Sequence, residues 1–319
     1  MIHQYFCSSP SVEPLLQQPG ILAIVGHNSP CAAPDAPGVI PVGLQSLSNH
    51  QFEVLRFGDQ PVSRGITGRC HWSRTNDITC VAIWLTPEQC QDIESSSYSA
   101  YAELLRFLQD DKHPYPFRIW NFLSHINEGD GDLERYKKFC VGRLNAFTEM
   151  GIPNEQFPAA SALGNQCDGA VIYALASAKP GHQHENPNQY RAYQYPRQYG
   201  PSSPSFSRAT SIHFAEDREK LLFISGTSSI LGHQTKAIGD FNSQIKITLD
   251  NVETLIKLLQ TNRDNIMALR VYLRNADDLA KAKEYLAREL GQLDINYTLA
   301  NICRKDLLVE MEATVRCPA

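Results

Sequence analysis

Two glutamates and a cysteine lie close together near the end of the chain, in the segment CRKDLLVEMEATV. Residues 307–314 alternate as a half-buried strand does, which places Glu310 and Glu312 on the same face. A carboxylic acid can donate a proton near pH 7 only if its pKa is raised, and burial and a neighbouring acid both raise it. The pair could therefore supply a general acid. The alternative is that both carboxylates are solvated or paired with arginines, because acids are rarely fully buried.

Composition indicates a reduced, globular protein. The chain has 319 residues, of which 42% are hydrophobic, and this size suits two or three domains. The formal net charge of −5 gives no reason to expect nucleic acid or a membrane surface as a partner, although clustered arginines could still bind a small anion. Nine cysteines without a CxxC pair predict free thiols in a cytoplasm. We expect neither a signal peptide nor a membrane span.

The elements that must position the acidic pair follow a repeated order. The first two-thirds of the chain alternate strand-like runs with two helical stretches, one at 86–111 that begins at Thr86 or restarts near Ser95, and one at 134–150. In the last third, strands near 220–230 and 266–275 each precede a helix, at 240–259 and 276–290, and two further strands follow. This β-α-β-α-β-β order predicts an α+β layer with helices on one face of a mixed sheet.

A long irregular stretch at 179–207 interrupts this pattern. Its four tyrosines and two arginines have large surfaces to pack, so we expect a functional loop rather than disorder. His182, His184 and Glu185 stand together in it, but no further ligand is near in the sequence, so we predict no metal site.

The C-terminal third resembles the RidA (YjgF) superfamily in FISGTSS, TLDNVETLI, RVYLRNADDLAKAKEYL and KDLLVEMEA. Glu310 matches the strand-borne glutamate of that family. However, the position of the family's carboxylate-binding arginine falls near Ile295, which argues against an imine or enamine deaminase. A non-catalytic ligand-binding module is a further alternative, disfavoured by Glu310 and the several arginines.

The chain from about 117 to 313 resembles a narrower family, the chorismatases. The motifs are FRIWNFLSHIN, ERYKKFCVGR, FPAASALG, YPRQYGPSSPSFSRA, FISGTSSILGH, RVYLR and NICRKDLLVEMEA. The resemblance implies an α+β fold of three RidA-like units in pseudo-threefold arrangement. We place a degenerate unit at 1–110, a central unit at 111–210 and a C-terminal unit at 211–319, with the active site between the last two. A monomer is expected, because three sheets in one chain can cover one another.

The same resemblance implies an enzyme that cleaves the enol ether of chorismate and releases pyruvate without a cofactor. It assigns Glu310 as the proton donor, with Glu312 supporting it. Cys303 is inert packing by default, but in chorismatases a cysteine here accompanies 3-hydroxybenzoate, alone or with 4-hydroxybenzoate. A small residue without a thiol accompanies the non-aromatic dihydrodiol.

Chorismate carries two carboxylates, which arginine binds well because its planar fork matches a carboxylate. Each arginine could instead form a structural salt bridge. The arginines considered are Arg118, Arg143, Arg197, Arg208, Arg270 and Arg304. The predicted substrate-binding residues are Arg143, Arg197, Tyr199, Arg208, Arg270 and Gly226.

Overall fold

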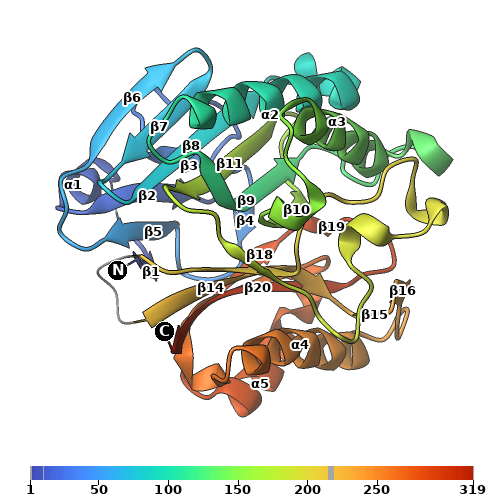
Figure 1. Ribbon diagram of the computed structural model, residues 1–319. Coiled ribbons are helices and arrows are strands. Elements are labelled where there is room, and N and C mark those ends of the chain that lie inside the picture. Colours follow the sequence, from blue (N-terminus) through green and yellow to red (C-terminus); the bar gives the residue numbers. More distant parts are fainter. Residues whose placement is uncertain (1, 10, 215–218, 319) are drawn as a thin grey trace.

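The computed structural model describes residues 2–9, 11–214 and 219–318, and three β-sheets organise them (Figure 1). The first sheet has the order β1-β5-β2-β3 and comes from the N-terminal residues. Its strands are β1 (Ile2–Cys7), β5 (Phe52–Phe57), β2 (Ile21–Gly26) and β3 (Val39–Pro41), and the short helix α1 (Glu13–Leu16) lies beside them.

The second sheet has seven strands in the order β19-β10-β9-β11-β8-β7-β6. They are β19 (Asn301–Ile302), β10 (Ala159–Gly164), β9 (Tyr115–Leu123), β11 (Ala170–Ser177), β8 (Ile78–Leu85), β7 (Cys70–Arg74) and β6 (Ser63–Thr67). Helices α2 (Ile93–Gln109) and α3 (Arg135–Glu149) cover its outer face (Figure 1).

The third sheet has seven strands in the order β12-β13-β14-β20-β17-β18-β4. They are β12 (His182–His184), β13 (Ala209–Ile212), β14 (Glu219–Ser228), β20 (Val309–Pro318), β17 (Ile266–Leu273), β18 (Ile295–Leu299) and β4 (Gln45–Ser46). Helices α4 (Phe241–Leu258) and α5 (Leu279–Leu290) cover it at the opposite end of the molecule, next to a small ribbon of β15 (Ile230–Leu231) and β16 (Gln234–Thr235) (Figure 1).

Apolar residues between the sheets join the three units. One buried cluster contains Leu22 from the first sheet, Trp120 from the second and Phe223 from the third. Two further clusters lie under the helix pairs. The α+β class and the organisation into three sheet units are confirmed, and the first unit lacks a covering helix pair.

The sheets divide the chain at different residues from those predicted. The second sheet takes its main strands from residues 63–177, so the boundary expected near residue 110 falls between two strands of one sheet. The reason is that α2 buries Leu104, Leu105 and Leu108 in the cluster that also contains Val81 from β8 and Ile119 from β9. The boundary expected near residue 210 falls within β13, after β12 has already joined the third sheet.

Two short strands are exchanged between units. β4, from the N-terminal part of the chain, pairs with β18 at the edge of the third sheet. β19, from the C-terminal part, pairs with β10 at the edge of the second sheet. Each short strand covers an edge that would otherwise present unpaired backbone groups.

Local predictions were mostly correct for helices and central strands and failed for short strands. The second helical stretch begins as predicted, and the first starts at Ile93, close to the alternative start near Ser95 and not at Thr86, with Asp92 capping the amide of Ser95. The missed strands are β1, β3, β4, β6, β7, β12, β13 and β16. The expectation that the terminal strand is half-buried was wrong: β20 is buried on both faces from Val309 to Val315, because the face with the acids packs against the second unit. Among the described residues, no helix is long and apolar enough to span a bilayer.

Candidate active site

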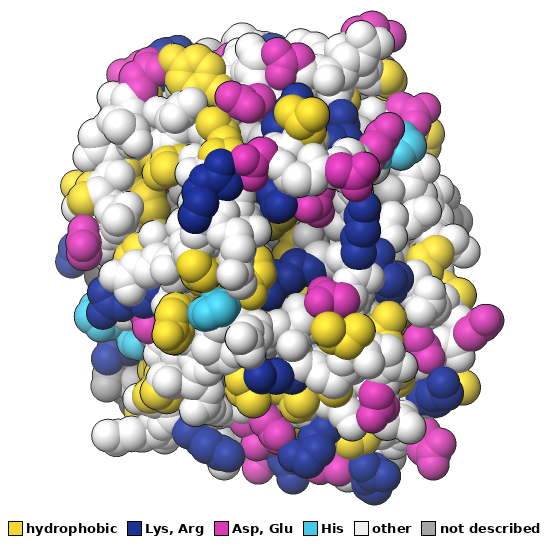
Figure 2. Space-filling view, turned by 90° about the vertical axis from the view of Figure 1, so that its right-hand side faces the viewer, with side chains coloured by type: hydrophobic (Ala, Val, Ile, Leu, Met, Phe, Trp, Pro, Cys, Tyr) yellow, Lys and Arg dark blue, Asp and Glu magenta, His cyan; other side chains and the backbone are white. Residues whose placement is uncertain are grey.

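A cleft of about 450 Å³ opens between the second and third units. Its walls come from the segments before α3 and before β13, from the end of β14, and from the turn between β19 and β20. Figure 2 views the side of the molecule where these loops meet, and Lys and Arg side chains surround a hollow near its centre. The cationic residues that line the cleft are Lys137, Arg208, Arg304 and Lys305.

Glu310 lies in the cleft, near the start of β20, and its side chain is almost fully buried. The Ser228 hydroxyl donates to its Oε2 at 3.1 Å. Burial raises the pKa of Glu310 to about 8, and the charge of Glu312 adds to this, while the hydrogen bond from Ser228 and the charges of Arg118 and Arg208 oppose it. The carboxyl group is therefore mostly protonated at pH 7, as a proton donor requires.

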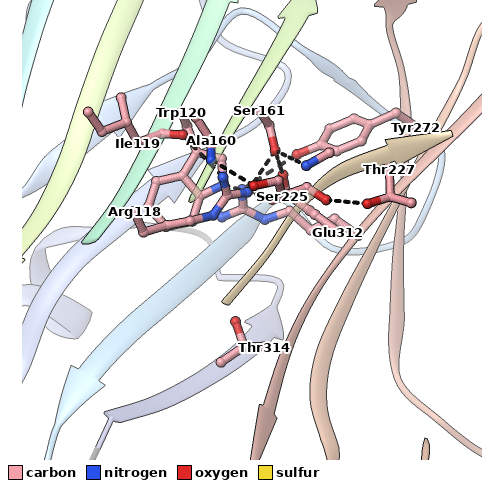
Figure 3. Close-up of polar contacts among 12 residues, drawn as sticks. Arg118, Ile119, Trp120, Ala160, Ser161, Ser225, Thr227, Tyr272, Glu312 and Thr314 are labelled. Carbon is pink, nitrogen blue, oxygen red and sulfur yellow. Dashed lines mark hydrogen bonds and ion pairs between the residues drawn. The ribbon is translucent and has the colours of Figure 1, made fainter. Parts of the chain in front are cut away.

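Glu312 occupies the same face of β20 but a different environment. Arg118 Nη2 and Trp120 Nε1 donate to its two oxygens at 2.6 and 2.7 Å, and Arg270 Nη1 donates to Oε1 at 2.6 Å (Figure 3). Burial opposes its ionisation, but the charges of Arg118 and Arg270 outweigh that effect and lower the pKa of Glu312. The two acids thus differ in protonation, and such divergence separates a proton donor from a fixed negative charge.

Arg270 belongs to this buried network and does not line the cleft. Its guanidinium forms a two-pronged ion pair with Glu53 from β5, in addition to its bond to Glu312. Gln4 from β1 also donates to Glu53, at 2.6 Å. All three units therefore meet at these charges, and the expected clamping of substrate by Arg270 does not fit its position.

Two other predicted arginines also lie outside the cleft lining. Arg143 is buried in α3, where its guanidinium lies 4.9 Å from the Phe139 ring and donates to Cys140 Sγ at 3.8 Å. Arg197 is exposed and pairs with Asp132 through bonds of 2.9 and 2.6 Å. Nearby residues reach the cleft instead, namely Tyr136 on the helix and Tyr199 in the loop.

Arg208 and Arg304 are the arginines that line the cleft. Arg208 is 3% exposed and donates to the Tyr190 carbonyl at 2.8 Å and the Tyr195 hydroxyl at 2.7 Å. Arg304 stacks 4.1 Å from the centre of the Tyr199 ring and donates to the His233 carbonyl at 2.9 Å. Aromatic and carbonyl neighbours thus hold both guanidinium groups in place.

Sequence reasoning missed several residues of the lining. Arg304 was considered as one of six arginines but not selected, although it directly follows Cys303 and precedes the KDLLVEMEA motif. Tyr195 opens the YPRQYG segment that was expected to reach the cleft. The unselected lining residues include Tyr136, Lys137, Tyr195, Ser228, Arg304 and Lys305.

Cys303 and Gly226, both named among the expected site residues, line the cleft together with Glu310. Burial, with the nearby charge of Glu310, raises the pKa of Cys303 to about 12, so the thiol keeps its proton at neutral pH. A Cβ atom at position 226 would collide with Glu310 Oε1, so glycine is needed for this close approach.

Within the described part of the chain, no group of three or more His, Cys, Asp or Glu side chains could hold a metal ion. His184 shares a hydrogen bond of 2.9 Å with the Ser211 hydroxyl, and neither His182 nor His184 lines the cleft.

Comparison with known proteins agrees with this geometry. The family model described as chorismatase FkbO/Hyg5-like, N-terminal, matches residues 53–176. A chorismatase from Streptomyces hygroscopicus is 32% identical over 91% of this chain and 86% of its own length. A 3-hydroxybenzoate synthase from the same organism is 36% identical over 68% of each chain. A crystal structure of a chorismatase superposes with a TM-score of 0.87 at 28% identity, covering 99% of this chain and 98% of that one. The chain is therefore an enzyme of the chorismatase family.

Proposed function

We propose that the protein converts chorismate to 3-hydroxybenzoate and pyruvate. The observation that carries the proposal is a buried Glu310, whose pKa burial raises, in a cleft lined by four cationic side chains. The relative named 3-hydroxybenzoate synthase supports the aromatic product.

Arg208 and Arg304 are suited to bind the two substrate carboxylates. Each guanidinium is already oriented by neighbours, so less side-chain freedom is lost when a carboxylate binds. Lys137 and Lys305 add positive charge to the same cleft, which favours a dianion over a neutral ligand. Tyr199, whose hydroxyl lies 3.0 Å from His233 Nδ1, is the aromatic support of Arg304.

Glu310 would transfer its proton to the terminal methylene carbon of the enol ether, which leaves an oxocarbenium ion. In the aromatic route, the oxygen of the substrate's own 4-hydroxyl adds to this ion and releases its proton. The ring then loses its hydrogen at C3 as the C4–O bond breaks, so the ring becomes aromatic, and the three-carbon fragment separates from the remaining ring oxygen as pyruvate. Hydroxybenzoate and pyruvate together contain the atoms of chorismate, so the conversion needs no oxidant. Cys303 lies beside Glu310 in the cleft and is positioned to orient the captured group.

The test is to incubate the purified protein with chorismate, follow pyruvate release, and separate the products by chromatography. We expect 3-hydroxybenzoate, with 4-hydroxybenzoate as a possible second product whose share the chromatogram measures. Dialysis against a chelator should leave the rate unchanged. A chromatogram with only the dihydrodiol would replace the aromatic route by hydrolysis.

The variant Glu310→Gln tests the proton donor, since glutamine keeps the shape of the side chain but cannot deliver a proton. General acid catalysis contributes about 10²–10⁴-fold, so kcat should fall by at least that range's lower limit, with little change in KM. Retention of more than about a tenth of the wild-type kcat would place the proton donor elsewhere. The expected monomeric state stays a prediction that light scattering can check.

A further inference from the structure

The strand that contacts Glu310 is irregular at the point of contact. In the pairing of β14 with β20, Ile224 faces Ala313 and Thr227 faces Met311. Ser225 and Gly226 therefore both lie opposite Glu312, and two residues against one form a β-bulge. Bulges redirect backbone groups away from the regular ladder, and here those groups face the second unit.

The second unit binds the bulge through β10. The Ala160 amide donates to the Ser225 hydroxyl at 2.9 Å, and the Gly226 amide donates to the Ser161 hydroxyl, also at 2.9 Å. Ser161 is 2% exposed. Without its hydroxyl, the Gly226 amide would lose the partner that this structure gives it at the junction of the two units.

Ser161 also connects the bulge to the buried charges. Its oxygen accepts a second hydrogen bond from Arg118 Nη2 at 2.7 Å, and its proton is donated to Glu312 Oε2 (Figure 3). A hydroxyl has one proton to donate and two lone pairs to accept with, so all three are used. Since the ionised Glu312 takes the proton, the orientation of the hydroxyl is fixed and its lone pairs face Gly226 and Arg118.

The position of Gly226 in turn limits the position of Glu310. The carboxyl group of Glu310 lies so close to the Gly226 Cα that there is no room for a Cβ atom, and Ser228 two residues later donates to the same carboxyl group. Gly226 and Ser228, at the end of β14, thus fix the position of the Glu310 carboxyl group. A displacement of these residues would displace the acidic proton relative to the bound substrate.

We propose that Ser161 is a positioning residue for proton transfer, which holds the bulge at Gly226 so that the Glu310 carboxyl group keeps its orientation toward the cleft. The inference rests on the proposed function, because it assumes that Glu310 is the proton donor. Ser161 acts through Gly226 and does not line the cleft itself.

The experiment compares Ser161→Ala with wild type and with Ser73→Ala in chorismate turnover from pH 6 to pH 9. Ser73 is a matched control, because it is 1% exposed and its hydroxyl likewise joins two units, by donating to the Leu22 carbonyl far along the chain from the cleft. If Ser161→Ala does not fold, Ser161→Cys replaces it, since a thiol keeps much of the volume but is a weak donor and acceptor.

We expect kcat of the Ser161 variant to fall about 100-fold, as a displacement of about 1 Å can cause, while KM stays nearly constant. The pH at which kcat/KM declines should also be lower in this variant. A displacement of Gly226 would admit water to Glu310, and the reduced burial would lower the pKa of its carboxyl group. The groups that act on Glu310 are Glu312 from its own strand and, from neighbouring elements, Ser228, Arg118, Arg208, Arg274 and Cys303.

Three results would overturn the inference. One is a Ser161 variant with wild-type kcat. Another is a fall in kcat that equals the loss of folded protein, together with a kcat/KM that declines at the same pH as in the wild type. That pattern would indicate a purely structural role for Ser161. The last is wild-type protein that does not convert chorismate, which refutes the proposed function and the inference with it, and is recognised from the wild-type sample alone.

Discussion

Turnover of chorismate should decline as the pH rises through about 8, the pKa to which burial raises Glu310. With that pKa, about 90% of Glu310 is protonated at pH 7 and about 10% at pH 9, so kcat/KM should fall about tenfold between them. A glutamate at its ordinary value of 4.5 would be only about 0.3% protonated at pH 7. Burial thus increases the protonated population about 300-fold at neutral pH.

The assay is steady-state pyruvate release at fixed ionic strength, with circular dichroism at each pH to show that the protein stays folded. Cys303, whose pKa is raised to about 12, does not titrate in this interval. A rate that stays constant from pH 7 to pH 9, or that already falls near pH 4.5, would refute the assignment of Glu310 as the buried acid. The same shift affects stability: the folded state binds a proton that the unfolded state releases, so this contribution is complete below pH 4.5 and is lost as the pH rises to about 8.

Further substitutions test the other residues. Cys303→Ala should shift the products toward the non-aromatic dihydrodiol, measured by chromatography, and an unchanged product ratio would limit Cys303 to packing. Arg208→Lys should raise KM about 10- to 100-fold, since a lysine cannot reproduce a forked bond to a carboxylate while contacting Tyr195; an unchanged KM would exclude Arg208 from substrate binding. Glu312→Gln should lower the free energy of unfolding in urea by about 3–5 kcal/mol, because Arg118 and Arg270 would lose a buried counter-charge, and a loss below about 1 kcal/mol would contradict that reasoning.

Local patterns predicted the elements that bear the acids, but not the partners of the charges. Alternation along β20 placed Glu310 and Glu312 on one face, and that follows from backbone geometry alone. The different environments of the two acids do not follow from backbone geometry, since the charge of Glu312 is balanced by Arg118, 194 residues away in the chain. Arg270 was expected at the substrate because Glu53, its partner 217 residues away, has no local signal.

The unit boundaries failed for a similar reason. Strand β8 precedes α2 and strand β9 follows it, and their order is compatible with one sheet or with two. They share a sheet because β11, which comes later in the chain, pairs with both of them, and α2 packs over that sheet. Arg304 was passed over because its selection depends on Tyr199, which reaches it from an irregular loop without a periodic pattern.

The exchanged strand β19 determines how the cleft can admit a ligand. Ile302 in β19 is paired with the second sheet, and Cys303 follows it directly, whereas Glu310 is in the third sheet. One wall of the cleft, at Cys303, thus follows directly after a strand of the second sheet, and another, at Glu310, belongs to the third sheet. Opening by separation of the units would therefore break the backbone hydrogen bonds between β19 and β10. Access then depends on the surface loops, which meet at the exposed ion pair of Arg197 with Asp132. Arg197 does not line the cleft, yet its ion pair joins two loops whose neighbouring residues, Gly131 and Gln198, do.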